Sequence, residues 1–262
     1  MTCHPYKAIE LQHPIDSSCG LTGTGQGASA LQNQTKNNFC AGTSYQSISQ
    51  SDLLSKQQNV AALPGYLEWS PQSIPDSRSD FVTLGEGTAV QFVGYLLESH
   101  YADLTSGESV NCDVKDDDAS NDIHIALVPQ SATTDECQSN TAEMVPHYRP
   151  ASWTVANLNK IGRATLVRVS GQLMYDASHK ICGEQGFSAT DDPHRLSGWE
   201  IHPVYAFDVC VKQSGSTCAQ WQALSDWVTA AAKSHGKTAK PRHHAASPSS
   251  TGSAGENPPK QP

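Results

Sequence analysis

The strongest constraint on the fold comes from residues 197–210, whose sequence SGWEIHPVYAFDVC alternates at the period of a β-strand. Side chains two residues apart lie on the same face of a strand. One face is apolar and is expected to enter a hydrophobic core; it carries Trp199, Ile201, Tyr205, Phe207 and Val209. The opposite face carries Glu200, His202 and Asp208, so an acid and an imidazole are expected side by side, outside that core.

Four other segments also have the pattern of strands. They cover residues 90–96, 123–127, 141–148 and 167–175, and the last of them has the most regular alternation in the chain. Gly94 marks a bulge or bend in the first. A short helix that begins at Ser152 and runs to Leu158 separates the third strand from the fourth. The resulting order, β-β-β-α-β-β, predicts an OB-fold-like five-stranded barrel. A β-sandwich or an open α+β sheet is the alternative.

The barrel domain is expected to span residues 81–234, with an extension before it and a tail after it. Residues 1–80 are expected to contribute one or two helices that pack on the barrel. One of these begins at the capping box Ser49-Gln-Ser-Asp52 and ends before Pro64-Gly65. Gly23–Gly27 is interpreted as a linker, because no strand precedes it and no lysine-bearing helix follows it.

The carboxyl-terminal part of the chain changes from a helical pattern to low complexity. Trp221, Leu224, Val228 and Ala231 have the spacing of an amphipathic helix. Residues 235–262 consist mainly of Lys, Pro, Ser, Gly and His, and they predict a disordered tail because they offer little apolar surface to bury.

Eight cysteines favour disulfides and an oxidising compartment, either periplasmic or extracellular. None lies in a Cys-x-x-Cys pair, which argues against zinc ribbons and thioredoxin-like motifs. Order along the chain suggests the pairs Cys19–Cys40, Cys112–Cys137 and Cys210–Cys218, with Cys3 and Cys182 left over. Eight cysteines allow 105 connectivities, and reduced, partly buried thiols are the alternative. Residues 1–7 lack the apolar segment of a signal peptide, so export would require a leader that these residues do not supply.

Charge and hydropathy restrict the classes of partner. The net charge is −9, which argues against a non-specific nucleic-acid binder, because such proteins need a basic surface for phosphates. No apolar run approaches the roughly 18–20 residues that span a bilayer. The acidic segment at residues 113–122 lacks the glycine and terminal glutamate of an EF-hand loop. A small molecule, a saccharide or a protein remains as the expected ligand.

Carboxylate and imidazole side chains recur together in the predicted sheet and its loops. The pairs are Asp122 with His124, Glu143 with His147, Asp176 with His179, and Glu200 with His202. Ile123, Ile125 and Ile201 are expected to face the core. Asp122 with His124, and Glu200 with His202, are therefore expected to point outward, onto one common surface. Taken singly, each pair is also explained as surface residues that connect neighbouring strands.

Such a cluster suits either a divalent cation or acid–base chemistry, since imidazole is both a metal ligand and a base near neutral pH. The candidate catalytic residues are His124, His179, Glu200 and His202. The candidate metal ligands are His124, His202 and Glu200. The candidate ligand-binding residues are Asp122, Glu143, His147, Arg149, Arg168 and Asp176, in which the arginines would orient an anionic group.

Several of these motifs together resemble a family of bacterial proteins that often carry export signals and for which no activity is established. The motifs are GESVNC at 107–112, NDIHI at 121–125, TAE at 141–143 with PHYRP at 146–150, VSGQLMYDASH at 169–179, and WEIHPV at 199–204. The resemblance covers roughly residues 19–230. It implies bacterial origin and export, and it assigns no role to any residue.

The sequence therefore predicts an exported, disulfide-bonded, OB-like barrel that binds a ligand across its second and third strands and its two long loops. The first alternative is a metal-assisted hydrolase that acts on phosphodiesters, an expectation from fold analogy. The second alternative is a structural envelope protein without a small-molecule site.

Overall fold

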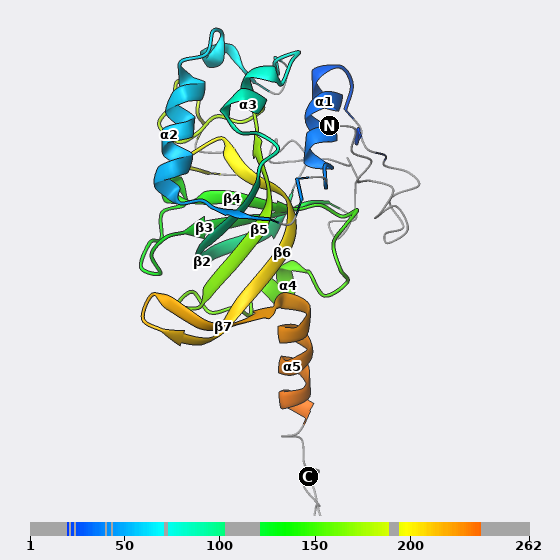
Figure 1. Ribbon diagram of the computed structural model, residues 1–262, viewed down its shortest axis with the longest axis vertical. Coiled ribbons are helices and arrows are strands. Elements are labelled where there is room, and N and C mark those ends of the chain that lie inside the picture. The colour runs from blue at the N-terminus through cyan, green and yellow to red at the C-terminus, as the bar shows by residue number, and fades with distance from the viewer. Residues whose placement is uncertain are drawn as a thin grey trace, which may run out of the picture.

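A closed barrel of five strands forms the centre of the computed structural model, which describes residues 20, 22–23, 25–39, 41–42, 44–70, 73–102, 121–188 and 194–236. The barrel strands are β2 (Ala89–Tyr101), β3 (Ile123–Val128), β4 (Asn140–Met144), β5 (Leu166–Tyr175) and β6 (Trp199–Ser214). Helices flank the barrel, and one of them follows the last strand (Figure 1). The prediction of a mainly β protein with a five-stranded barrel and flanking helices is confirmed.

The strands follow the order β2-β3-β4-β6-β5, and β5 pairs with β2 to close the barrel. Neighbouring barrel strands are antiparallel except β4 and β6, which are parallel. The helix α4 (Val155–Leu158) lies between β4 and β5 as expected, although Thr154 rather than Ser152 caps it. Two strands extend the sheet: β1 (Gln46–Ser47) pairs with β2, and β7 (Thr217–Ala223) pairs with β6.

Close approach of β5 and β6 explains a local departure from the predicted alternation. A Cβ atom at Gly171 would lie 2.3 Å from the carbonyl oxygen of Pro203, so glycine is needed there. The pairing of the two strands is irregular at this point. Tyr205 was expected in the core, but it is half-buried and its hydroxyl donates to the carbonyl of Asn38. Val204 packs in the core in its place.

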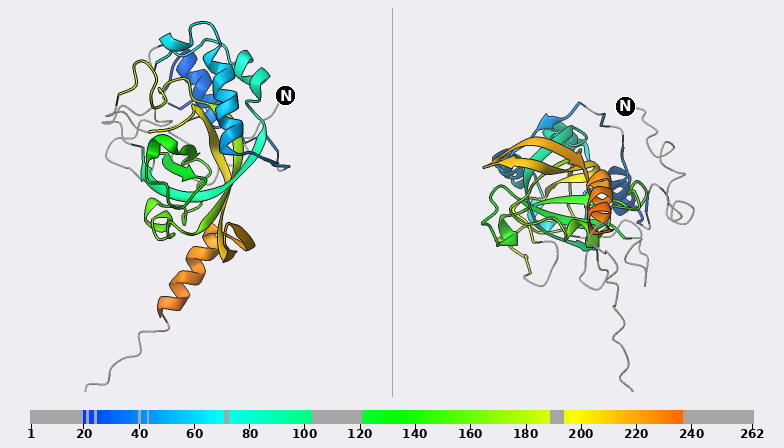
Figure 2. Two further views of the ribbon diagram at one scale, coloured as in Figure 1. Left: turned by 90° about the vertical axis from the view of Figure 1, so that its left-hand side faces the viewer. Right: turned by 90° about the horizontal axis from the view of Figure 1, so that it is seen from below.

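Helices lie at both ends of the barrel (Figure 2). At one end are α1 (Ala28–Lys36), α2 (Gln50–Ala61), the 3-10 helix η3 (Tyr66–Glu68) and α3 (Ser79–Leu84). The predicted capping box at Ser49 and Asp52 is present at the start of α2. At the other end, α5 (Leu224–Gly236) projects away from the barrel. Trp221 was expected in this helix, but it belongs to β7.

The core joins the inward faces of the strands to these helices. Its largest cluster includes Ile123 and Ile125 of β3 and Trp199 and Ile201 of β6. Leu53 and Val60 of α2 and Leu224, the first residue of α5, belong to the same cluster, so α2 and the start of α5 pack onto the barrel core. Full burial of one such side chain stabilises a fold by about 1.5–3 kcal/mol.

Two disulfides join the described cysteines. Cys210–Cys218 links β6 to β7, as predicted. Cys137 pairs with Cys182, so the expected pair Cys112–Cys137 is wrong. The loop after β5 returns beside the 3-10 helix η6 (Glu136–Gln138), where the amide of Leu196 donates to the carbonyl of Ser139. Cys182 in this loop therefore lies next to Cys137, although the two cysteines are 45 residues apart in the sequence.

Some predictions fall outside the described residues: the pair Cys19–Cys40, Cys3, Cys112, the loop at 107–118 and the tail from residue 237. Among the described residues, no helix combines the length and apolar character that crossing a bilayer requires.

Candidate metal centre

The site begins where β4 and β6 run side by side in the same direction. Ala142 of β4 is in register with Ile201 of β6, and both are buried in the core. The next residues along each strand, Glu143 and His202, therefore lie on the opposite face. Glu143 Oε2 lies 3.1 Å from His202 Nδ1.

The neighbouring strand β3 adds a second imidazole to the same carboxylate. His124 is directly opposite Glu143 in the antiparallel pairing of β3 with β4. Its Nε2 atom lies 3.2 Å from Glu143 Oε2. One buried carboxylate therefore meets two imidazoles that come from two different strands.

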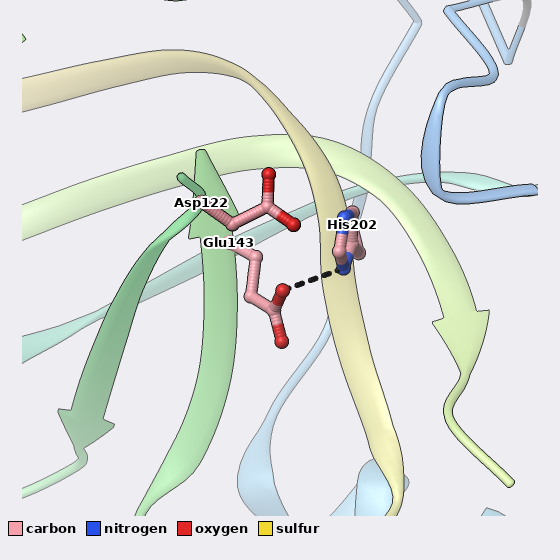
Figure 3. Close-up of side chains that lie close together, drawn as sticks. All are labelled: Asp122, Glu143 and His202. Atoms are coloured by element: carbon pink, nitrogen blue, oxygen red, sulfur yellow. Dashed lines mark ion pairs between the residues drawn. The ribbon is translucent and has the colours of Figure 1, made fainter. Parts of the chain in front are cut away.

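Asp122, the residue before β3, completes a group that we call the metal triad: Asp122, Glu143 and His202. One ligand atom from each of these residues lies within 4.8 Å of the others, and the two carboxylates point toward the imidazole (Figure 3). Ligands about 2.1 Å from a tetrahedral ion lie roughly 3.4 Å apart, so small side-chain rotations close this group around a cation. Within the described part of the chain, His202 Nε2 is buried and has no hydrogen-bond partner.

The metal triad does not face solvent, which corrects one expectation. The side chains point away from the apolar core, as the alternation predicted. However, Asp122, His124, Glu200 and His202 are each at most 2% exposed. The helix α1 packs against this side of the sheet: Gln32 Nε2 donates to Asp176 Oδ1 at 2.9 Å, and Gln172 Nε2 donates to the carbonyl of Thr35. The buried Lys36 of α1 interacts with the charges of Asp122, Glu143 and Glu200.

A buried arginine connects the remaining carboxylates to the metal triad. Arg195 Nη1 lies 2.9 Å from Glu200 Oε2, and Arg195 Nη2 lies 2.9 Å from Asp176 Oδ2. Glu200 Oε1 in turn lies 2.9 Å from His202 Nδ1. His179 Nδ1 contacts Asp176 Oδ2 at 2.5 Å. A continuous chain of charged contacts therefore extends from His179 to the metal triad.

Four carboxyl groups thus lie together in the interior, and we call them the buried acidic cluster: Asp122, Glu143, Asp176 and Glu200. Burial alone would lower the pKa of Lys36, yet the buried acidic cluster raises this pKa above its ordinary value. Arg195 behaves in the same way, since Asp176 and Glu200 offset its burial and raise its pKa. Two fixed cations therefore balance part of the negative charge.

The carboxyl groups themselves divide into two types. Burial would raise the pKa of Glu143, but His124 and His202 hold it well below its usual value. Burial likewise opposes ionisation of Asp176, and His179 and Arg195 outweigh it, so this pKa is also well below its usual value.

The other two carboxyl groups hold their protons more tightly. Burial raises the pKa of Asp122. Burial and the charge of Glu143 raise the pKa of Glu200. A divalent cation bound beside these two groups would favour their ionised forms.

The remaining candidate residues have other environments. His147 is buried in the turn after β4. Arg149 donates to the carbonyls of Asn121 and Met144, which adjoin Asp122 and Glu143, so it holds the backbone at the metal triad. Arg168 pairs with Asp208, which is roughly 20 Å along β6 from His202, and therefore serves another part of the barrel.

Three polar residues of this site were not predicted from the sequence: Gln32, Lys36 and Arg195. Gln32 and Lys36 are four residues apart, which places them on one face of α1, but that face is polar and gives no apolar stripe. Arg195 lies in the loop before β6, where no periodicity fixes the direction of a side chain.

Comparisons with protein-family models, with curated proteins and with solved structures find no match to this chain. The site is therefore interpreted from its own geometry and chemistry.

Proposed function

We propose that this protein binds a divalent cation through Asp122, Glu143 and His202. The observation that carries this proposal is the convergence of three ligand atoms within 4.8 Å, from side chains that are at most 2% exposed. One imidazole with two carboxylates suits Zn²⁺, and Mn²⁺ as the harder alternative.

Charge supports a cation at this position. The buried acidic cluster has four carboxyl groups, and Lys36 and Arg195 are the fixed cations that the structure places against it. Among the described residues, the four carboxyl groups outnumber these two cations, and the imidazoles of His124, His179 and His202 are the other basic groups that contact them. Buried charge without a counter-charge is costly, and one divalent cation would neutralise this excess.

The surroundings favour a binding protein over a hydrolase. A metal-assisted phosphodiesterase needs an ion that a bulky substrate can reach, whereas the three side chains of the metal triad are buried and Lys36 of α1 lies near them. The Nε2 atom of His202, which has no hydrogen-bond partner among the described residues, would gain a ligand bond from the ion. An ion that ties together β3, β4 and β6 would also stabilise the barrel.

We also propose that the barrel is OB-like and that the protein is exported. The strand order β2-β3-β4-β6-β5, the parallel contact of β4 with β6 and the position of α4 support the first point. The two disulfides support the second, because such bonds persist in oxidising compartments.

The test is the metal content of the full chain and its affinity for Zn²⁺ and Mn²⁺. Protein purified without chelator is analysed by elemental mass spectrometry, and the ion-free protein is titrated by calorimetry. Glu143→Gln and Asp122→Asn are each expected to lose high-affinity binding, while Glu68→Gln, an exposed glutamate on η3, binds as the wild type does. Circular dichroism shows whether each variant is folded.

Two substitutions are used so that one misfolded variant does not decide the result. The proposal fails if the wild type binds no ion in stoichiometric amount. It also fails if a folded Glu143→Gln or Asp122→Asn variant binds both metals as tightly as the wild type.

A further inference from the structure

A second group of imidazoles lies beside the metal triad, nearer to the surface. A hollow there is lined by three histidines and two glutamates, which we call the outer histidine hollow: Glu98, His100, His124, Glu136 and His194. These residues come from β2, β3, η6 and the segment before β6. His100 and His124 are directly paired across β2 and β3, with ring centroids 5.3 Å apart.

The carboxylates of the hollow are placed between the imidazoles. Glu98 Oε1 lies 3.4 Å from His100 Nδ1, and Glu136 Oε2 lies 3.6 Å from His194 Nδ1. Both distances exceed a normal hydrogen bond of about 2.7–3.2 Å, so these ion pairs are loose. Glu98 and Glu136 also interact with each other. This interaction is a side-chain hydrogen bond, so the two carboxyl groups lie close enough to face one cation.

The size and exposure of the hollow suit an ion rather than an organic ligand. Its volume is about 10 Å³, which holds about one water molecule. The side chains of Glu98, His100, Glu136 and His194 are 42%, 33%, 32% and 26% exposed. An ion can therefore reach the hollow from solvent, and these side chains have room to rotate around it. His194 Nε2 is buried and has no hydrogen-bond partner within the described part of the chain.

We propose that the outer histidine hollow binds a second metal ion, Zn²⁺, through His100, His124 and His194 with a carboxylate of Glu98 or Glu136. Three imidazole nitrogens select zinc over magnesium or calcium, which prefer oxygen ligands. Among the described residues, the ligand atoms of the metal triad are already within 4.8 Å of one another. The side chains of the outer histidine hollow, in contrast, must rotate toward one another to bind an ion. The outer site is therefore the weaker of the two.

His124 links the two sites. Its ring lines the outer histidine hollow, and its Nε2 atom lies 3.2 Å from Glu143 Oε2 of the metal triad. The outer site uses residues that the proposed inner site does not need, namely His100 and His194. Each site is therefore testable without the other, and His124 is left unchanged in the test.

The experiment measures Zn²⁺ stoichiometry by equilibrium dialysis and calorimetry on four full-length proteins: the wild type, His100→Ala/His194→Ala, Glu143→Gln and Glu68→Gln. The wild type and Glu68→Gln are expected to bind two Zn²⁺ ions, with the second bound more weakly. The His100→Ala/His194→Ala variant is expected to lose the weaker ion and keep the tighter one. Glu143→Gln is expected to keep an ion that depends on His100 and His194.

Co²⁺ in place of Zn²⁺ gives a second readout, because its visible absorption depends on the coordination number and ligand field of each site. The expected result is a band that is lost in His100→Ala/His194→Ala and kept in Glu143→Gln. The proposal is overturned if His100→Ala/His194→Ala binds as many Zn²⁺ ions as the wild type, with the same affinities. It is also overturned if the wild type binds one ion that Glu143→Gln abolishes. If only the proposed inner site is wrong, the wild type and Glu143→Gln still bind one Zn²⁺ ion, and His100→Ala/His194→Ala does not bind it.

Discussion

Glu143 and His202 face each other across the parallel contact between β4 and β6, with 3.1 Å between Glu143 Oε2 and His202 Nδ1. The same oxygen meets His124 from β3. Glu143 is therefore an ionised carboxylate at the junction of three strands, and its pKa is well below the usual value because the two imidazoles outweigh its burial. Any ion bound here is coupled to the stability of the barrel.

Removal of the ion should destabilise the protein. A ligand that binds only the folded state at about 100 times its Kd stabilises that state by about 2.7 kcal/mol. The thermal midpoint is expected to fall when EDTA is added and to recover with Zn²⁺. The measurement is best made in the His100→Ala/His194→Ala background, in which only the metal triad is intact. A midpoint that EDTA leaves unchanged in protein shown to contain metal would contradict the prediction.

Lys36→Met should have opposite effects on metal affinity and on stability. The Lys36 ammonium group competes with a cation for the buried acidic cluster, so its loss is expected to raise Zn²⁺ affinity about tenfold. Without metal, the same change removes a buried counter-charge and is expected to cost about 3–5 kcal/mol of unfolding free energy. Calorimetric titration and urea unfolding measure the two effects. Lys212→Met, on an exposed part of β6, should change neither; equal affinities in Lys36→Met and the wild type would refute the competition.

Arg195→Met should be among the most destabilising substitutions outside the apolar core. Arg195 is fully buried and pairs with both Asp176 and Glu200, and removal of one partner from such a pair costs about 3–5 kcal/mol. Arg168→Met is the matched control. Its ion pair with Asp208 is partly exposed, so a cost of about 1 kcal/mol or less is expected. Urea unfolding that ranks the two variants equally would show that Arg195 does not hold the cluster together.

Asp176→Asn should change how stability depends on pH. The pKa of Asp176 in the folded protein lies well below its ordinary value of 3.8, because His179 and Arg195 outweigh burial. A lowered carboxyl pKa contributes stability above the unfolded-state pKa, and this contribution is lost as pH falls through the folded-state pKa.

The difference in unfolding free energy between the wild type and Asp176→Asn should therefore be constant from about pH 6 to pH 5 and shrink from about pH 4 downward. Urea titrations at a series of pH values measure it. A difference that stays unchanged down to about pH 3 would mean that Asp176 has an ordinary pKa in the folded protein.

Alternation in the sequence predicted the barrel well where each strand has one apolar and one polar face. Val167, Val169, Leu173 and Tyr175 alternate at strand period, and β5 presents all four to the core. The prediction failed for Tyr205, since Gly171 lets the strands approach and shifts their pairing. Trp221 and Leu224 have helical spacing, yet the helix begins only at Leu224.

The site was predicted only in part, for a related reason. His202 was recognised as a candidate because its neighbour Ile201 is apolar, and Glu143 because it lies four residues before His147 in the predicted third strand. The layer that covers them gave no such signal, because α1 buries Gln32 and Lys36 rather than apolar side chains. The face of a strand on which a side chain lies can be predicted from a single sequence. The presence of a polar helix that packs over that face cannot.

The bond between Cys137 and Cys182 has a consequence for how the protein matures. It joins the segment that carries Glu136 to the loop that returns with His194 and Arg195, so it connects two parts of the outer histidine hollow and lies near the arginine that pairs with Glu200. Until thiol oxidation occurs, those pieces are connected through 45 residues of chain. Zinc loading should thus follow oxidative folding, and a cell compartment with reducing thiols would yield a chain that captures metal poorly.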